Sequence, residues 1–254
     1  MAGFQQVKVN RDLEFTGAAL YQPNVKGPMM TEYKIADFTF EGTSTLYGWS
    51  STTGANGLTL ARANLDGGAM TMTMGGVLSD CGEFYHNAVW SASKSCGMQA
   101  KLKISQITVV NVCVGFIDAY TNTDDRVALE MNGAALTNCV NTADAAGMVF
   151  DTNANTDVWY CAAVNDGAEG TPVAAKGTLI PTADTYFYVR VQTDTAGNVT
   201  FYYGTNNNLV AVGYLSAAIA YGATNLLAPY IGFIARDTTA QVCTISRVTV
   251  WQDN

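Results

Sequence analysis

Apolar and polar residues alternate at a period close to two in many parts of this chain. The clearest examples are residues 70–74, 100–104 and 189–191, which read MTMTM, AKLKI and VRV. This period places apolar side chains on one face of a β-strand and polar side chains on the other. The pattern therefore predicts strands that are buried on one face only.

Short clusters of turn-forming residues separate these runs, for example STTGANG at 51–57 and NDG at 165–167. The clearest hairpin is predicted over residues 186–203, where two β-prone runs flank the sequence DTAGN. Gly197 and Asn198 in that sequence tolerate a positive φ angle. Repeated strand–turn–strand spacing of this kind predicts antiparallel sheets.

Two longer runs are almost continuously apolar. Residues 109–117 are interrupted only by Asn111, and residues 226–234 contain Pro229. Such runs are typical of strands that are covered on both faces. Pro229 argues against the second strand, because proline is poorly tolerated inside a central strand.

Three further segments have mixed patterns. Residues 242–251 alternate but change phase after Ile245, which predicts a β-bulge. The alanine-rich residues 134–146 and 216–223 are expected to form a short helix or a turn, although neither has an apolar stripe.

The first 32 residues differ from the rest. They have weak periodicity and contain Pro23, Pro28 and the adjacent Met29 and Met30. We interpret residues 1–32 as an extended N-terminal arm that contacts a partner through these four residues. A terminal strand packed on its own sandwich is the alternative.

Composition supports one all-β domain at residues 33–254. A chain of 254 residues can form a single β-sandwich. Charged residues make up only 13%, about half the ~25% usual for soluble domains, whereas 48% are apolar. A surface with few charges loses little when it is desolvated against another subunit. The same composition would also suit a monomeric β-protein with threonine-rich strands.

The charge balance indicates which classes of partner the protein can bind. Thirteen Lys and Arg against 21 Asp and Glu give a net charge of −8, and the densest basic cluster is the pair Lys101 and Lys103. Nucleic-acid binding depends on clustered cations, so none is expected. Neither a signal peptide nor a membrane span of about 18 apolar residues is recognised.

The six cysteines are expected to be free and mostly buried, since disulfides are rare in a reducing cytoplasm. They are Cys81, Cys96, Cys113, Cys139, Cys161 and Cys243.

From residue 33 onward, the order of several motifs resembles the concanavalin A-like jelly-roll sandwiches, which include legume lectins, laminin-G modules and a group of glycan hydrolases. The motifs are GGAMTMTMGG, MQAKLKISQITVVNVCVGFIDA, AGMVFDTNANTDVWYCAAVNDG, TYFYVRVQTDTAGNVTFYYGTNNNLVA and ISRVTVWQDN. The resemblance implies a jelly-roll of two antiparallel sheets.

More narrowly, GFIDA, FDTNANTDVWY and DTAGNVTFYY resemble virion structural proteins of tailed bacteriophages. This resemblance implies a non-enzymatic capsid decoration or cement protein, assembled in the host bacterial cytoplasm. It would act as a homo-oligomer, with a trimer expected, on the major capsid protein or other virion proteins. A carbohydrate-recognition module on a virion and a glycan hydrolase remain the alternatives, so a glycan partner stays open.

No catalytic residue or cofactor is expected. The related hydrolases carry two carboxylates on one strand as E-x-D-x-E or a close variant, to act as nucleophile and acid. No two glutamates here have that spacing, although distant carboxylates could still meet in space. The single His86 cannot by itself form a triad or a histidine-rich metal site.

One segment has the alternating oxygen side chains of a calcium loop: Asp151, Asn153, Asn155 and Asp157. Thr156 stands where such a loop needs glycine, and Ala162 where it needs a bidentate glutamate. An ordinary Asx-rich turn is therefore favoured, and no metal is expected.

Aromatic residues are grouped at 186–188 and 201–203, which read YFY and FYY. Alternation on two adjacent strands must turn some of these rings outward, where they could contact carbohydrate or protein. Core packing is the commoner use of such rings.

Overall fold

A computed structural model describes residues 33–40, 49–53, 59–63, 65, 67–118, 126–139, 142–220 and 225–253. The predicted arm at 1–32, with Pro23, Pro28, Met29 and Met30, lies outside the described residues. Within them the chain forms two large antiparallel sheets, one short two-stranded sheet and a single 3-10 turn, η1 (Ala92–Lys94). No helix in this part of the chain is long and apolar enough to cross a membrane.

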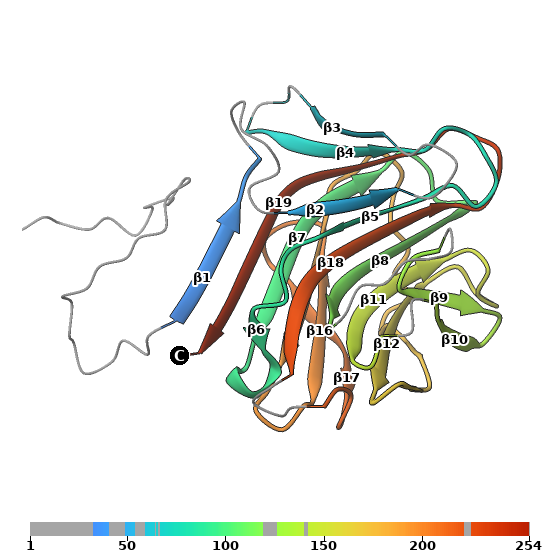
Figure 1. Cartoon of the computed structure of the whole chain (residues 1–254). Coiled ribbons are helices and arrows are strands. Elements are labelled where there is room, and N and C mark those ends of the chain that lie inside the picture. Colours follow the sequence, from blue (N-terminus) through green and yellow to red (C-terminus); the bar gives the residue numbers. More distant parts are fainter. Residues whose placement is uncertain are drawn as a thin grey trace, which may run out of the picture.

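The first sheet, called sheet A, has eight strands in the order β17-β16-β15-β7-β19-β4-β3, and β1 also pairs with β19 (Figure 1). The strands are β1 (Tyr33–Phe38), β3 (Thr59–Ala63), β4 (Ala69–Thr73), β7 (Gly97–Ile104), β15 (Phe187–Thr193), β16 (Val199–Gly204), β17 (Val210–Leu215) and β19 (Val242–Asp253).

The second sheet, called sheet B, follows the order β13-β12-β11-β8-β18-β5-β2, with β14 beside β12 and β6 beside β18. The strands are β2 (Ser50–Thr53), β5 (Cys81–Tyr85), β6 (Trp90–Ser91), β8 (Val110–Ile117), β11 (Ala145–Asp151), β12 (Trp159–Asn165), β13 (Ala168–Glu169), β14 (Val173–Ala174) and β18 (Leu226–Ala235).

The main hydrophobic core lies between the two sheets. Alternating strands point one set of side chains inward, so that β7 and β15 bury every second residue. Aromatic rings fill much of this layer: Trp49 stacks on Phe84 with ring centres 4.4 Å apart, and Trp159 meets Phe187 edge to face at 5.5 Å. This interior fixes which face of each strand is exposed.

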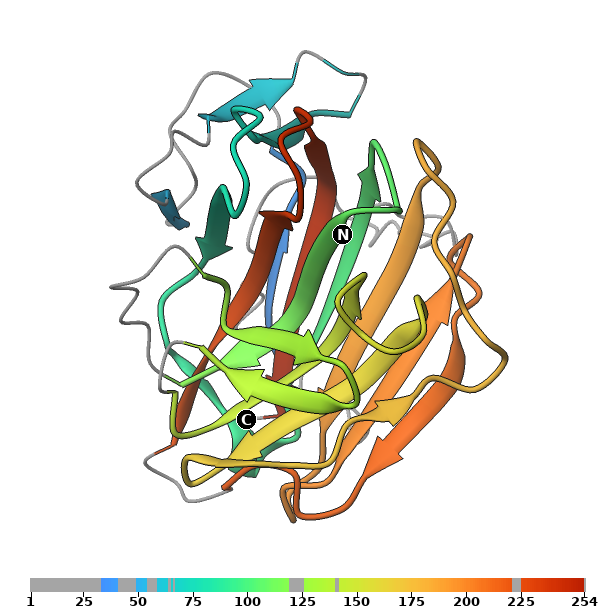
Figure 2. The same cartoon turned by 90° about the vertical axis from the view of Figure 1, so that its right-hand side faces the viewer.

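A second apolar layer covers the outer face of sheet B. The hairpin of β9 (Leu129–Asn132) and β10 (Ala135–Asn138) lies over the sheet and encloses this layer (Figure 2). Tyr230 reaches into it from β18, where its hydroxyl donates to Glu83 at 2.5 Å and accepts from the Ala128 N–H at 2.8 Å. Because β8, β11 and β18 carry apolar side chains on both faces, they appear in the sequence as continuous apolar runs.

The predictions for the main strands are confirmed. Residues 70–73, 100–104 and 189–191 lie in half-buried strands, while Met74 follows the first of them. The predicted hairpin is formed by β15 and β16, over residues 187–204. Gly197 in its turn has a φ of 75°. The phase change in β19 is a register shift between Ile245 and Arg247, as expected for a bulge.

The objection to a strand at Pro229 is wrong. Pro229 lies inside β18, and its carbonyl accepts the N–H of His86 at 3.1 Å. The N and C=O of one residue point to the same side of a strand, so the missing N–H faces the gap between β6 and β5. Proline therefore removes no ladder hydrogen bond at this position.

The prediction of a helix or turn over 134–146 is also wrong, because residues 135–138 form β10 and residues 145–151 form β11. Because the side chain of alanine is small, these alanine-rich segments show no hydrophobic alternation by which β10 and β11 could be recognised in the sequence. The described part of 216–223 is a turn, with Ala217 at a φ of 47°.

All six cysteines are free thiols, and all but Cys139 are buried. Burial raises the pKa of Cys96 to about 12, more than a hydrogen bond with Thr193 lowers it. Burial also raises the pKa of Cys161 to about 12. Neutral thiols of this kind pack as small apolar groups.

Candidate functional site

The outer face of sheet A gathers aromatic and cationic side chains. On β15 and β16 the inward positions are taken by core residues such as Phe187 and Phe201, so Tyr188, Arg190 and Tyr202 point outward. Neighbouring strands add further outward side chains from β7 and β19. We call this set the aromatic–cationic face, and its members are Gln99, Lys101, Lys103, Tyr186, Tyr188, Arg190, Tyr202 and Trp251.

Strand pairing determines which of these residues meet. Lys101 lies directly opposite Tyr188 across the β7–β15 pair. Its Nζ is 4.8 Å from the ring centre of Tyr186 and 5.8 Å from that of Tyr188, and Lys103 Nζ is 5.5 Å from Tyr186. At these distances an ammonium group is attracted by the negative face of the ring.

Arg190 occupies the middle of the face. Its guanidinium carbon lies 5.3 Å from the ring centre of Tyr202 and 5.6 Å from that of Trp251. Nε and Nη2 both donate to Gln99 Oε1, at 3.0 and 2.7 Å. These contacts hold the guanidinium near both rings and leave its remaining N–H groups available for a ligand.

Trp251 is positioned by a glycine on the neighbouring strand. Gly97 lies opposite Trp251, and a Cβ added at Gly97 would stand 2.4 Å from Cζ2 of the indole. The ring therefore lies on the backbone of β7, in space that any side chain at residue 97 would fill. A ring fixed in this way loses little conformational entropy when a ligand packs on it.

The charged members of the aromatic–cationic face are all cations: Lys101, Lys103 and Arg190. The carboxylate of Asp37, on the adjacent β1, is bound by Arg247 at 2.9 and 2.6 Å and by the hydroxyl of Thr249 at 2.9 Å. None of the ion pairs among the described residues involves Lys101, Lys103 or Arg190. The face thus offers three cations without a carboxylate partner in that part of the chain, together with several rings.

The four calcium-loop candidates lie at the end of β11 and in the turn after it, and Asp151 is engaged there by protein groups. Its carboxylate accepts five hydrogen bonds: from Arg236 at 2.6 and 3.1 Å, from the side chain of Asn111, and from the N–H groups of Met131 and Asn153. The bond from the Asn153 N–H forms an Asx-turn.

The guanidinium of Arg236 therefore binds the carboxylate oxygens that a calcium ion would need as ligands. Among the described residues, the hydrogen-bond partners of this carboxylate do not include Asn155 or Asp157. Within the described ranges, no group of three or more His, Cys, Asp or Glu side chains is arranged to hold a metal.

Two distant carboxylates do meet in space, which the sequence left open. Glu130 from β9 and Asp151 share Nη2 of Arg236, at 2.9 and 2.6 Å. Their side chains are only 3% and 0% exposed. Burial lowers the pKa of Arg236, but the hydrogen bonds and charges of Asp151 and Glu130 outweigh this effect and raise it overall. Arg126 also binds Glu130, with its Nε 3.1 Å from Oε1, so two guanidinium groups balance the two carboxylates. The carboxylates are buried and do not line an open groove.

His86 lies between aromatic rings, 5.3 Å from Phe38 and 5.7 Å from Trp49. Its pKa is lowered, mainly by burial and also by the charge of Lys34, while a hydrogen bond with the backbone of Asn87 opposes this. His86 is thus packed among aromatic side chains, as a structural residue would be.

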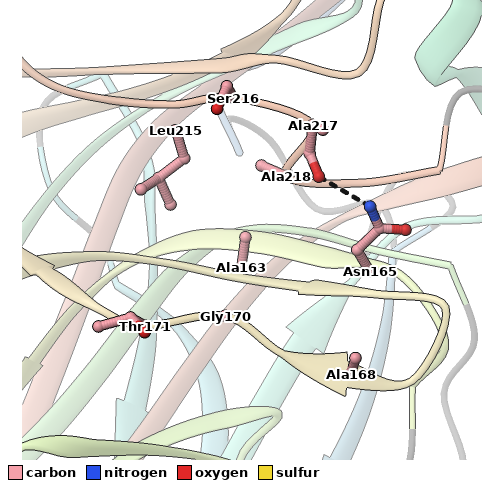
Figure 3. Close-up of a pocket in the computed structure, with 9 residues that line it drawn as sticks. All are labelled: Ala163, Asn165, Ala168, Gly170, Thr171, Leu215, Ser216, Ala217 and Ala218. Atoms are coloured by element: carbon pink, nitrogen blue, oxygen red, sulfur yellow. Dashed lines mark hydrogen bonds between the residues drawn. The ribbon is translucent and has the colours of Figure 1, made fainter.

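A small pocket of about 170 Å³ lies between the β12–β13 turn and the segment after β17 (Figure 3). The amide of Asn165 is already bound to the carbonyl of Ala217 at 2.7 Å. Most of the lining is small and apolar: Ala163, Ala168, Gly170, Leu215, Ala217 and Ala218, with Thr171 and Ser216 adding hydroxyl groups. The pocket offers fewer directed polar groups than the aromatic–cationic face.

The aromatic–cationic face was only partly predictable. Alternation indicated that some rings of 186–188 and 201–203 point outward, and this is confirmed for Tyr188 and Tyr202. The roles of Arg190, Gln99 and Trp251 were missed. No local signal links these residues, because they come together only through the strand order β16-β15-β7-β19.

No protein-family model and no curated protein sequence matches the chain. Solved structures do. Peanut lectin bound to a nine-residue peptide is 11% identical, with a TM-score of 0.56 over 87% of this chain and 97% of the lectin. The β-glucanase of Bacillus licheniformis is 12% identical, with a TM-score of 0.56 over 87% and 98%.

A third similar structure is the CBM2 module of the evolved Dit protein of Lactobacillus casei BL23 phage J-1. It is 12% identical, with a TM-score of 0.54 over 88% of this chain and 98% of the module. At such low identities the likeness concerns the fold. Together with the two antiparallel sheets, it shows that the described part of the chain is a concanavalin A-like jelly-roll sandwich.

Proposed function

We propose that this protein is a non-enzymatic carbohydrate-binding module that binds glycans on the aromatic–cationic face of sheet A. The observation that carries the proposal is a group of rings and cations on the outer face of sheet A, where Tyr186, Tyr188, Tyr202 and Trp251 lie beside Arg190 and two lysines. Glycan binding needs flat apolar surfaces for the C–H faces of sugar rings and polar groups for their hydroxyls. This face supplies both.

Two further observations support a binding role over catalysis. One pair of carboxylates that meet, those of Glu130 and Asp151, is buried and held by Arg236, so neither of these two is presented to a substrate. Similar solved structures include a lectin and a phage carbohydrate-binding module, although a glucanase is also among them.

The test is a glycan array followed by affinity measurements on the best ligand with Tyr188→Ala and Tyr202→Ala. Removing a ring on which a sugar packs should cost roughly 1.5 to 3 kcal/mol, which is tenfold or more in Kd. Tyr160→Ala is the matched control, because Tyr160 is a half-buried tyrosine on sheet B. Equal losses in all three variants, or no glycan bound by the wild type, would contradict the proposal.

The second candidate is a structural protein of a bacteriophage virion, as a capsid decoration protein or a module of another virion component. Its support is the likeness to a module of a phage J-1 protein, together with a surface that carries few charges. In this role the protein would form a homo-oligomer on the capsid or on other virion proteins, after assembly in the bacterial cytoplasm.

Virions that lack the protein test this second candidate. They should lose physical stability or show empty surface positions by electron microscopy. Particles with unchanged stability and density would contradict a decoration role, while glycan binding by the purified protein could still hold.

A further inference from the structure

We infer that the aromatic–cationic face takes an acidic polysaccharide, whose sugar rings pack on the tyrosines while its anionic groups pair with Lys101, Lys103 and Arg190. This inference rests on the proposed function and names the chemical class of its ligand. It starts from the position of the cations among the rings, which a face for neutral sugars would not need.

The positive charges on this face contrast with the negative net charge of the whole protein. The protein has a net charge of −8, yet Lys101, Lys103 and Arg190 lie on adjacent strands. Across the described residues these three make no ion pair, and the nearby carboxylate of Asp37 is taken by Arg247 and Thr249. A polyanion would supply the missing countercharges, whereas other parts of this acidic protein would repel it.

The geometry suits a chain of sugars. Outward side chains of the face come from β16, β15, β7 and β19, four neighbouring strands that span about 14 Å. Across them the cations alternate with rings: Tyr202 and Trp251 flank Arg190, and Tyr186 lies beside both lysines. Repeating units that each carry a ring and a charge match this alternation.

Arg190 is the cation best placed to bind a carboxylate of the ligand. Gln99 takes its Nε and Nη2 donors through a single oxygen, so the guanidinium is oriented while Nη1 keeps its hydrogens for a ligand. The two lysines act as point charges with rotatable donors, which tolerates variation in the position of the next anionic group.

The experiment compares polygalacturonate with its fully methyl-esterified form, which has the same backbone without the charge. The acid should bind several-fold more tightly than the ester at low salt, and this difference should shrink as NaCl is raised from about 0.05 to 0.5 M. The double variant Lys101→Gln/Lys103→Gln should lower affinity for the acid roughly three- to tenfold and leave affinity for the ester unchanged.

The control double variant is Lys94→Gln/Lys176→Gln. It removes the same charge from two exposed lysines that lie outside sheet A, and it should change neither affinity. Polyglutamate serves as an acidic chain without sugar rings and should bind more weakly than polygalacturonate.

The outcomes separate this inference from the proposed function. Equal binding of acid and ester, equal effects of the two double variants, or equal binding of polyglutamate would overturn the acidic-polysaccharide inference. If Tyr188→Ala still abolished binding of a neutral glycan in that case, the proposed function would stand. Absence of binding to the acid, the ester and every glycan on the array would overturn both.

Discussion

Arg236 is the residue that makes the acidic side chains on the outer face of sheet B compatible with burial. It lies in the turn after β18 and donates to both Glu130 and Asp151. Asp151 also accepts the N–H of Met131, so this cluster ties the β9–β10 hairpin to the end of β11. Two buried carboxylates without a cation would each carry a large desolvation cost.

The variant Arg236→Met should lower the free energy of unfolding by about 3 to 5 kcal/mol, because it preserves the side-chain volume and leaves Asp151 without its cation. Urea unfolding followed by circular dichroism measures this change. Arg247→Met is the comparison, since the Arg247–Asp37 pair is half exposed and should contribute at most about 1 kcal/mol. Similar losses in both variants would show that the buried cluster is not specially stabilising.

At the scale of elements, the β15–β16 hairpin places Tyr188, Arg190 and Tyr202 on the aromatic–cationic face, so its turn controls their register. Asp194 organises that turn. Its carboxylate accepts the N–H groups of Ala196 and Asn198 and the side-chain amide of Asn198, at 2.8, 3.0 and 2.7 Å. The pKa of Asp194 is lowered, first by the Asn198 side chain and then by the two backbone groups, while slight burial opposes this.

Replacement of Asp194 by alanine should cost about 1 kcal/mol of stability at pH 7, since these hydrogen bonds are largely exposed to water. Because the folded pKa lies below the unfolded value of about 3.9, the stabilisation is fully present above pH 5 and is lost as pH falls through the folded pKa. The difference in unfolding free energy between wild type and Asp194→Ala should therefore shrink below pH 4.

Thr195→Ala, in the same turn, is the control and should stay within about 0.5 kcal/mol of wild type at every pH. A pH-independent deficit in Asp194→Ala would mean that the ionised carboxylate is not what stabilises the turn.

For the whole molecule, sheet B joins two apolar layers. Its inner face contributes Phe84 to the core between the sheets, and its outer face contributes Tyr230 to the layer under the β9–β10 hairpin. Since the same strands supply both layers, neither layer can lose its packing without exposing one face of sheet B. We therefore expect the two layers to unfold together.

Phe84→Ala in the first layer and Leu136→Ala in the second should each lower stability by roughly 2 to 5 kcal/mol. In each variant and in wild type, the urea midpoints from far-UV circular dichroism and from tryptophan fluorescence should coincide. Trp49, Trp90 and Trp159 lie in the first layer, so an early circular dichroism transition in Leu136→Ala, with unchanged fluorescence, would show that the hairpin layer unfolds on its own.

The sequence predicted much of this arrangement where a local pattern carries the physical constraint. Alternation identified the half-buried strands, and a phase change located the bulge in β19. The sequence patterns failed at β10, a short alanine-containing strand with no distinctive period. They also failed at Pro229, whose missing N–H is harmless only because β5 ends at Tyr85 and β6 begins at Trp90 beside it.

By itself, the sequence determined the all-β class and which side chains of a strand share a face, because the period of two is a local property of extended backbone. Tertiary structure alone decided which strands become neighbours. It placed Lys101 opposite Tyr188, Trp251 over Gly97 and Arg236 between Glu130 and Asp151. These pairings depend on the packing of two sheets around one core, so residues far apart along the chain meet without leaving a pattern in it.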